Sequence, residues 1–188
     1  MGLDDYEQVE VLNRGELREW LRANHDRDRG VFLVVHKKHT DHWLPWGEIV
    51  PELLAWGWVD ATTRAVDEDR TSLLISPRRQ GSGWSRINKE HVEALEASGE
   101  MTDHGRAVIA RAKQDGSWAL LDDVEAGIVP DDLAAALTER DAWVQWEDLP
   151  WSTQRATLAW VTLAKRADTR ERRVTKAADV TASGGRPR

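Results

Sequence analysis

The sequence predicts an α+β fold: a small antiparallel three-stranded sheet packed by helices, followed by a mainly helical C-terminal half. Two patterns predict this class. Between residues 31 and 75, short β-branched and aromatic runs alternate with polar turns, as expected for strands. After residue 85, apolar side chains recur every three or four residues, as expected for helices. A chain of 188 residues buries about 70% of its unfolded surface, so the fold needs no disulfides, and the sequence contains no cysteine.

The first helix and the first strand have clear local signals. Asn13 followed by Glu16 has the form of a capping box, and Leu17 and Leu21 repeat at helical spacing behind it. Residues 31–35 form a continuous β-branched and aromatic run, which is typical of a buried strand. The chain therefore begins with a helix that leads into a strand.

A second helix and a hairpin follow. Residues 48–56 are expected to be helical, with Pro51 either in the first turn or at a kink. Residues 58–63 and 71–75 flank the acidic segment 67–69, whose polarity suits a turn. We expect these two runs to pair as an antiparallel hairpin that joins the first strand in the sheet.

Two further helices are expected after the hairpin. Ser85 is a good N-cap, and Ile87, Val92 and Leu95 give the helix behind it one apolar face. Thr102 caps the next helix, which contains an apolar stripe of its own. Both helices belong to the predicted N-terminal part.

The C-terminal half reads as helical. Pro130 suits a first helical position, and Ser152 suits the N-cap of a longer helix. We expect an α+β core over residues 1–123, a helical part over 124–180 and a disordered tail over 181–188, where glycine and serine accumulate.

The charge of the chain is unevenly distributed. The net charge is −7. Residues 164–188 carry eight Lys/Arg and three Asp/Glu, or +5, which leaves −12 for residues 1–163. An acidic body repels a phosphate backbone, so the field of the whole protein argues against nucleic-acid binding.

The first seven residues are acidic and contain neither a basic start nor an apolar stretch. We therefore expect no signal peptide, no membrane association and a cytoplasmic location.

Residues 56–88 are the most informative segment. Arg78 and Arg79 offer two planar donors that suit carboxylate or phosphate, Gly81 and Gly83 allow close backbone approach, and a helix N-terminus follows Ser85. This combination predicts a site for an anionic small molecule or an acidic protein segment, with tryptophan providing a stacking surface. The candidate ligand-binding residues are Trp58, Asp60, Arg78, Arg79, Ser82, Trp84, Ser85 and Asn88.

A structural interpretation of the same segment is equally open. Arg78 and Arg79 could form ion pairs across the hairpin with Asp60, Asp67 or Glu68, and the glycines could merely turn the chain. The two interpretations differ in whether the guanidinium groups face an open hollow.

Tryptophan makes up eleven of the thirteen aromatic residues. A buried aromatic side chain hides about 150–250 Å² of surface. Most of the tryptophans are therefore expected in the core, with two or three lining a cleft.

Metal and cofactor sites are not expected. His36, His39 and His42 are three residues apart, and on an extended chain His36 and His42 lie about 20 Å apart while His39 faces the other way. His25 and His104 suit local hydrogen bonding and an exposed first helical turn, respectively. No histidine motif accompanies the serines of the informative segment, so a nucleophilic triad has no support.

Motifs spread along the chain resemble the YdeI/OmpD-associated family, also labelled bacteriocin-protection proteins. They are Lys37-Lys38, Trp56-Gly57-Trp58-Val59-Asp60, Ser76-Pro77-Arg78-Arg79, Trp84-Ser85-Arg86-Ile87-Asn88, Gly99-Glu100-Met101-Thr102, Gln114-Asp115-Gly116-Ser117-Trp118 and Thr169-Arg170-Glu171-Arg172-Arg173. The resemblance implies protection against bacteriocins or antimicrobial peptides and association with a porin. It implies no defined chemical activity.

Three functional hypotheses follow. The first is a binding protein whose cleft lies between the sheet and the helix after Ser85. The second is an enzyme acting on a small anionic substrate, with Asp60 and the arginines near the chemistry. The third is a nucleic-acid binder that uses Arg78, Arg79, Arg86 and the basic tail.

Overall fold

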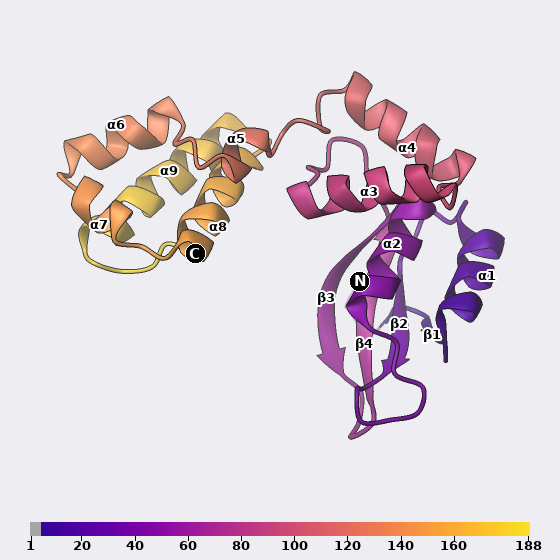
Figure 1. The fold of residues 1–188 in the computed structure, drawn as a ribbon. Helices are drawn as coiled ribbons and strands as arrows, with labels where there is room; N and C mark the ends of the chain where they lie inside the picture. The colour runs from indigo at the N-terminus through magenta and orange to yellow at the C-terminus, as the bar shows by residue number, and fades with distance from the viewer. Residues whose placement is uncertain (1–4) are drawn as a thin grey trace. The chain divides into compact units, whose positions relative to one another are not determined.

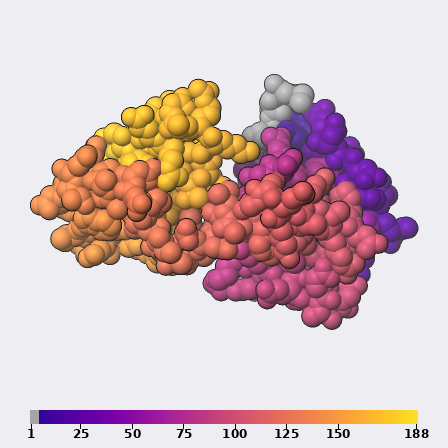
Figure 2. Space-filling view, turned by 90° about the horizontal axis from the view of Figure 1, so that it is seen from above, coloured from indigo at the N-terminus to yellow at the C-terminus, as the bar shows by residue number. Residues whose placement is uncertain are grey.

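The computed structural model describes residues 5–188. The chain divides into two compact units. The first comprises the chain up to Ser82 together with Ile87–Gly116, and the second comprises Gly83–Arg86 and Ser117–Arg188. Figure 2 shows the atoms of the first unit mainly in indigo to pink and those of the second in orange to yellow.

The sheet of the first unit has four strands in the order β1-β2-β4-β3. They are β1 (Gln8–Glu10), β2 (Val31–His36), β3 (Trp58–Ala65) and β4 (Arg70–Pro77). The predicted hairpin is present as β3 and β4, and β2 pairs antiparallel to β4. The prediction of three antiparallel strands is corrected by β1, which pairs parallel to β2. This strand has only three residues and no buried one, so it carries no apolar pattern.

Four helices belong to the described residues up to Gly116. They are α1 (Arg14–Asn24), α2 (Trp46–Ala55), α3 (Arg86–Ser98) and α4 (Asp103–Gln114). In Figure 1, α1 and α2 lie beside the sheet, and α3 and α4 follow the hairpin.

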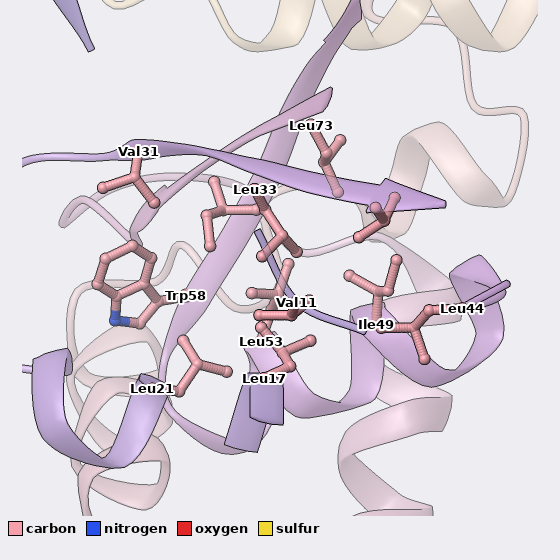
Figure 3. Close-up of a cluster of buried hydrophobic side chains, with 12 residues drawn as sticks. Val11, Leu17, Leu21, Val31, Leu33, Leu44, Ile49, Leu53, Trp58 and Leu73 are labelled. Atoms are coloured by element: carbon pink, nitrogen blue, oxygen red, sulfur yellow. The ribbon is translucent and has the colours of Figure 1, made fainter. Parts of the chain in front are cut away.

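The core of the first unit lies between the sheet and helices α1 and α2 (Figure 3). Successive side chains of a strand face opposite sides, so Leu33 and its alternate neighbours on β2 point into this core while Phe32 lies on the other face. Leu17 of α1 and Leu53 of α2 meet them there, at 0% and 1% exposure. Trp58, at the start of β3, is also fully buried in the cluster.

Helix starts follow the capping residues that the sequence contains. The Asn13 side chain accepts a hydrogen bond from the Glu16 amide at 3.0 Å, and Thr102 accepts one from the Gly105 amide at 3.1 Å. Both predicted caps are thus confirmed. Ile87 does not join the apolar face predicted for its helix, because its side chain is 54% exposed.

Helix α2 begins earlier than expected. It starts at Trp46, and Pro51 lies in its interior, not in its first turn. Pro45 occupies the N-cap position with an extended backbone. Proline at the start fixes a φ suited to helix entry.

The second unit is helical. Its helices are α5 (Asp122–Glu125), α6 (Asp131–Glu139), α7 (Trp143–Glu147), α8 (Trp151–Thr162) and α9 (Ala167–Ala182). A second apolar core fills this unit, with Leu133, Leu137 and Leu158 each at 0% exposure. The mainly helical C-terminal half is as predicted.

Local details of the second unit differ from expectation. Pro130 and Pro150 are N-cap residues of α6 and α8, so Ser152 lies inside α8 and does not cap it. Residues at the end of the C-terminal tail lie close to this unit. Pro187 is buried, and the Arg188 guanidinium lies 5.2 Å from the ring centre of Trp160. A cation over an aromatic face is attractive.

Among residues 5–188, no helix is long and apolar enough to cross a membrane.

Candidate functional site

A cavity of about 460 Å³ opens in the first unit where β4 ends. Its apolar wall comes mainly from Tyr6, Val59, Leu74 and Pro77. Its charged and polar lining consists of Asp28, Arg29, Ser76, Arg78, Arg79 and Ser82. The volume lies within the range of small-molecule sites, which is roughly 300–1,000 Å³.

The end of β4 positions the two adjacent arginines. The Arg78 amide donates to the Gly57 carbonyl at 2.9 Å, which continues the β3–β4 pairing past Pro77. The chain then turns, and the amide and the hydroxyl of Ser82 both donate to the Arg79 carbonyl, at 3.2 and 2.7 Å. Ser82 therefore fixes the turn that carries Arg79.

Arg78 and Arg79 occupy different environments. Arg78 is 8% exposed, and burial lowers its pKa to about 10, while the negative charge of Asp60 acts in the opposite direction. The guanidinium thus stays charged at neutral pH. Arg79 is exposed, so its charge is available to a ligand at lower desolvation cost.

A close backbone approach brings the start of β2 to the same cavity. A Cβ added at Gly30 would lie 2.4 Å from the Ile75 carbonyl oxygen, so only glycine fits there. The preceding residue, Arg29, lies with its guanidinium 5.9 Å from the ring centre of Tyr6. Residues from three distant parts of the chain therefore meet at the cavity.

The charge of the lining favours an anion. Among the described residues of the lining, Arg29, Arg78 and Arg79 are opposed by one carboxylate, Asp28. Guanidinium groups bind carboxylate and phosphate through paired hydrogen bonds. The arrangement can hold a small anionic group next to an apolar wall.

The structure brings three of the predicted site residues, Arg78, Arg79 and Ser82, to the cavity. Asp60 does not line it but acts electrostatically on Arg78.

The tryptophans of the predicted site lie elsewhere. Trp58 is fully buried and packs edge-on against Trp20, with ring centres 5.5 Å apart. Trp84 belongs to the second unit, is also fully buried, and packs against Trp118 at 4.9 Å. Neither indole offers a stacking surface, and Tyr6 is the aromatic ring in the lining.

Ser85 precedes α3 and Asn88 lies within it, and neither residue is among the described residues that line this cavity. The cavity lies between the strand ends and the segment before β2. A cleft between the sheet and α3 stays a prediction.

Sequence reasoning missed Tyr6, Asp28 and Arg29. The available signal was the run of alternating charge in residues 26–29, which ends at a glycine just before a buried strand. Such a glycine marks a close backbone approach. The approach at Gly30 places the preceding residues Asp28 and Arg29 at the cavity.

The ion pairs of the hairpin turn involve other residues. Asp67 binds Arg70, with Nη2 to Oδ2 at 2.7 Å, and Lys37 donates to the Asp67 and Glu68 carbonyl oxygens. Of the three carboxylates expected as partners of the two arginines, Asp60 acts electrostatically on Arg78.

The histidines do not lie as an extended chain would place them. The segment after β2 turns, so the rings of His36 and His42 lie 5.6 Å apart, which corrects the expected separation. His39 Nε2 lies 3.0 Å from Asp69 Oδ1. The rings of His25 and His104 also meet, at 4.7 Å.

Two protein-family models match the chain, one mainly in the first compact unit and one in the second. Residues 9–108, more than half of the chain, match the family described as Domain of unknown function (DUF8412). Residues 126–184 match the family described as Bacteriocin-protection, YdeI or OmpD-Associated. The family resemblance is thereby confirmed over the helices α6–α9. All described residues that line the cavity, except Tyr6, lie within the first match. No curated protein and no solved structure matches the chain.

Proposed function

We propose that this chain, which belongs to the DUF8412 domain family and contains a segment that matches the YdeI/OmpD-associated family, is a binding protein for an anionic ligand. The ligand enters the cavity at the end of β4. The observation that carries this proposal is that, among the described lining residues, three arginines face one aspartate in a cavity with an apolar wall.

The three arginines have separate roles in the proposal. Arg79 and Arg29 are exposed and form direct hydrogen bonds with the anionic group. Arg78 is buried and contributes a fixed positive charge at the floor. Charged hydrogen bonds contribute about 1.5–3 kcal/mol each, so the two exposed arginines supply about 3–6 kcal/mol. This corresponds to a Kd between about 5 mM and 50 µM.

That affinity suits a ligand with more than one point of contact. A phosphate- or carboxylate-bearing small molecule gains further affinity from its apolar body against Tyr6, Val59 and Leu74. An acidic protein segment is the second ligand class that the same chemistry accepts.

A protective role against bacteriocins or antimicrobial peptides, exerted in the cytoplasm, is part of the proposal. The protective role is supported by the description of the family that residues 126–184 match, Bacteriocin-protection, YdeI or OmpD-Associated. The anion site would be the means by which the protein recognises its partner.

Titration calorimetry on the full chain tests the binding step. We expect pyrophosphate and nucleotides to bind more tightly than inorganic phosphate, and Arg79→Gln to weaken binding at least tenfold. Arg22→Gln is the matched control, because Arg22 is exposed and pairs with Glu19 on α1. Equal affinities of the wild type and Arg79→Gln for every anion, acidic peptides included, would contradict the proposal.

A further inference from the structure

Three side chains that commonly bind metals meet between α1 and α4. His25 is the C-cap residue of α1, Asp26 follows it, and His104 is the second residue of α4. His25 Nε2 lies 3.4 Å from Asp26 Oδ1, and His104 Nδ1 lies 4.0 Å from the same oxygen. One ligand atom of each residue lies within 4.8 Å of the others. The fold therefore brings together residues that are almost eighty positions apart.

The His25 ring is already oriented for binding. Its Nδ1 lies 2.9 Å from the Arg22 carbonyl oxygen. A carbonyl only accepts hydrogen bonds, so Nδ1 carries a proton. Nε2, which lies 3.4 Å from Asp26 Oδ1, is the nitrogen that remains for a metal ion. In metal-binding histidines, one ring nitrogen binds the metal and the other characteristically donates a hydrogen bond to a carbonyl or carboxylate oxygen.

The packing around the cluster also holds both rings in place. The Trp56 ring lies 5.1 Å from the His25 ring. Gly57 has a φ of +70°, and a Cβ there would lie 3.4 Å from His104 Cδ2 and 2.6 Å from Val108 Cγ2. The rings are therefore confined, whereas the Asp26 side chain is 86% exposed and able to rotate.

We propose that His25, Asp26 and His104 bind one divalent transition-metal ion, with Zn²⁺ as the best match. Two imidazoles and one carboxylate form a donor set that Zn²⁺ accepts, and three protein ligands leave a fourth position open to water or another ligand. This site is separate from the anion cavity in its residues and chemistry.

The geometry needs only a small adjustment. In a tetrahedral site with metal–ligand distances of 2.0–2.1 Å, neighbouring ligand atoms lie about 3.3 Å apart. The pair of His25 and Asp26 already has this spacing. The other two pairs of ligand atoms lie within 4.8 Å. Bringing them to this spacing requires rotation of the exposed Asp26 carboxylate and a small shift of the two rings.

The Asp26 carboxylate supplies the negative charge of the proposed donor set and offsets part of the charge of a divalent ion. Asp26→Asn removes this charge from an exposed position, and the variant is expected to fold like the wild type.

Calorimetric titration of the full chain with Zn²⁺ tests the site. We expect one bound ion, and a loss of affinity of at least tenfold in each of His25→Gln, His104→Gln and Asp26→Asn. His42→Gln is the control, because its ring contacts His36 in the other histidine pair. That variant should bind Zn²⁺ as the wild type does.

Fluorescence provides a second measurement. A bound Co²⁺ ion should quench Trp56, which stacks near His25, and Trp56→Phe should abolish most of the quenching while keeping the stoichiometry. Failure to bind Zn²⁺, or binding that Asp26→Asn leaves unchanged but His42→Gln removes, would overturn the proposal.

Discussion

The negative charge of Asp60 acts on the buried guanidinium of Arg78 and opposes the fall in its pKa to about 10 that burial causes. Asp60 lies on β3, where it is paired with Ile75 of β4. It thus stabilises the charged form of an arginine that lines the cavity. The same carboxylate competes with any anion for that arginine.

This competition predicts opposite effects on stability and binding. Asp60→Asn should lower the free energy of unfolding by about 1–3 kcal/mol, because a buried charge loses its compensation. It should also raise the affinity for pyrophosphate severalfold. Urea unfolding and calorimetry measure the two effects. A variant that loses both stability and anion affinity would show that Asp60 supports the site in some other way.

A second buried charge lies in an ion-pair network outside the anion cavity. Glu52 of α2 has a fully buried side chain, and its carboxylate oxygens bind Arg14 at 2.5 Å and Arg18 at 2.9 Å. Its replacement leaves two arginines without this partner, so Glu52→Gln should cost about 3–5 kcal/mol of unfolding free energy. Glu100→Gln, at a side chain that is 37% exposed and binds the same arginines, should cost about 1 kcal/mol or less. Similar losses for both variants, measured in urea, would contradict this account.

Two glycines should respond oppositely to the same substitution. A Cβ at Gly105 would lie 2.3 Å from the Ala55 carbonyl oxygen, whereas one at Gly47 meets nothing within 4 Å. Gly105→Ala should therefore cost about 1–3 kcal/mol, by forcing α4 away from α2. Gly47→Ala, within α2, should be neutral or stabilise by up to about 1 kcal/mol. Thermal unfolding of the two variants gives the comparison.

Acid should weaken the second unit through two carboxylates. Hydrogen bonds from Arg155 to Glu125 and from Arg170 to Asp132 lower the pKa of each carboxyl below its ordinary value, 4.5 and 3.8 respectively. A lowered folded-state pKa gives a stabilisation that is fully present above the ordinary value and is lost as the pH falls through the folded one. Arg155→Gln and Arg170→Gln should therefore flatten the pH dependence of unfolding below about pH 5. An unchanged slope would mean that these pairs contribute nothing.

Local signals in the sequence predicted the local structure well. The side chains of Asn13 and Thr102 cap helices where the sequence indicates, and the apolar runs around the acidic turn form the β3–β4 hairpin. Each of these features depends on residues close together in the chain. The short β1 strand has no such pattern, because only its pairing with β2 makes it a strand.

The candidate site could be predicted only in part, for the same reason. The turn after β4 gave Arg78, Arg79 and Ser82, but Tyr6 and Arg29 reach the cavity through sheet pairing and the close approach at Gly30. The spacing of residues along the chain does not show which distant residues are brought together by sheet pairing. The meeting of His25 with His104 escaped prediction likewise.

The tryptophans show a second limit of prediction from the sequence. Trp58 and Trp84 stand in a segment rich in arginine and glycine, which favoured a ligand surface, yet both are fully buried. Burying an indole hides about 150–250 Å² of surface, and this gain exceeds what a stacking contact with a small ligand provides. Their burial leaves the arginines as the chemical signal of the segment.

The most direct test of the anion site is a crystal of the full chain soaked in tungstate, an anomalously scattering analogue of phosphate. The account predicts an anomalous peak inside the cavity, within hydrogen-bonding distance of the Arg79 guanidinium and next to Arg29 or Arg78. A cavity without a peak, when tungstate occupies other surface arginines at the same concentration, would contradict the claim that these residues form an anion-binding site.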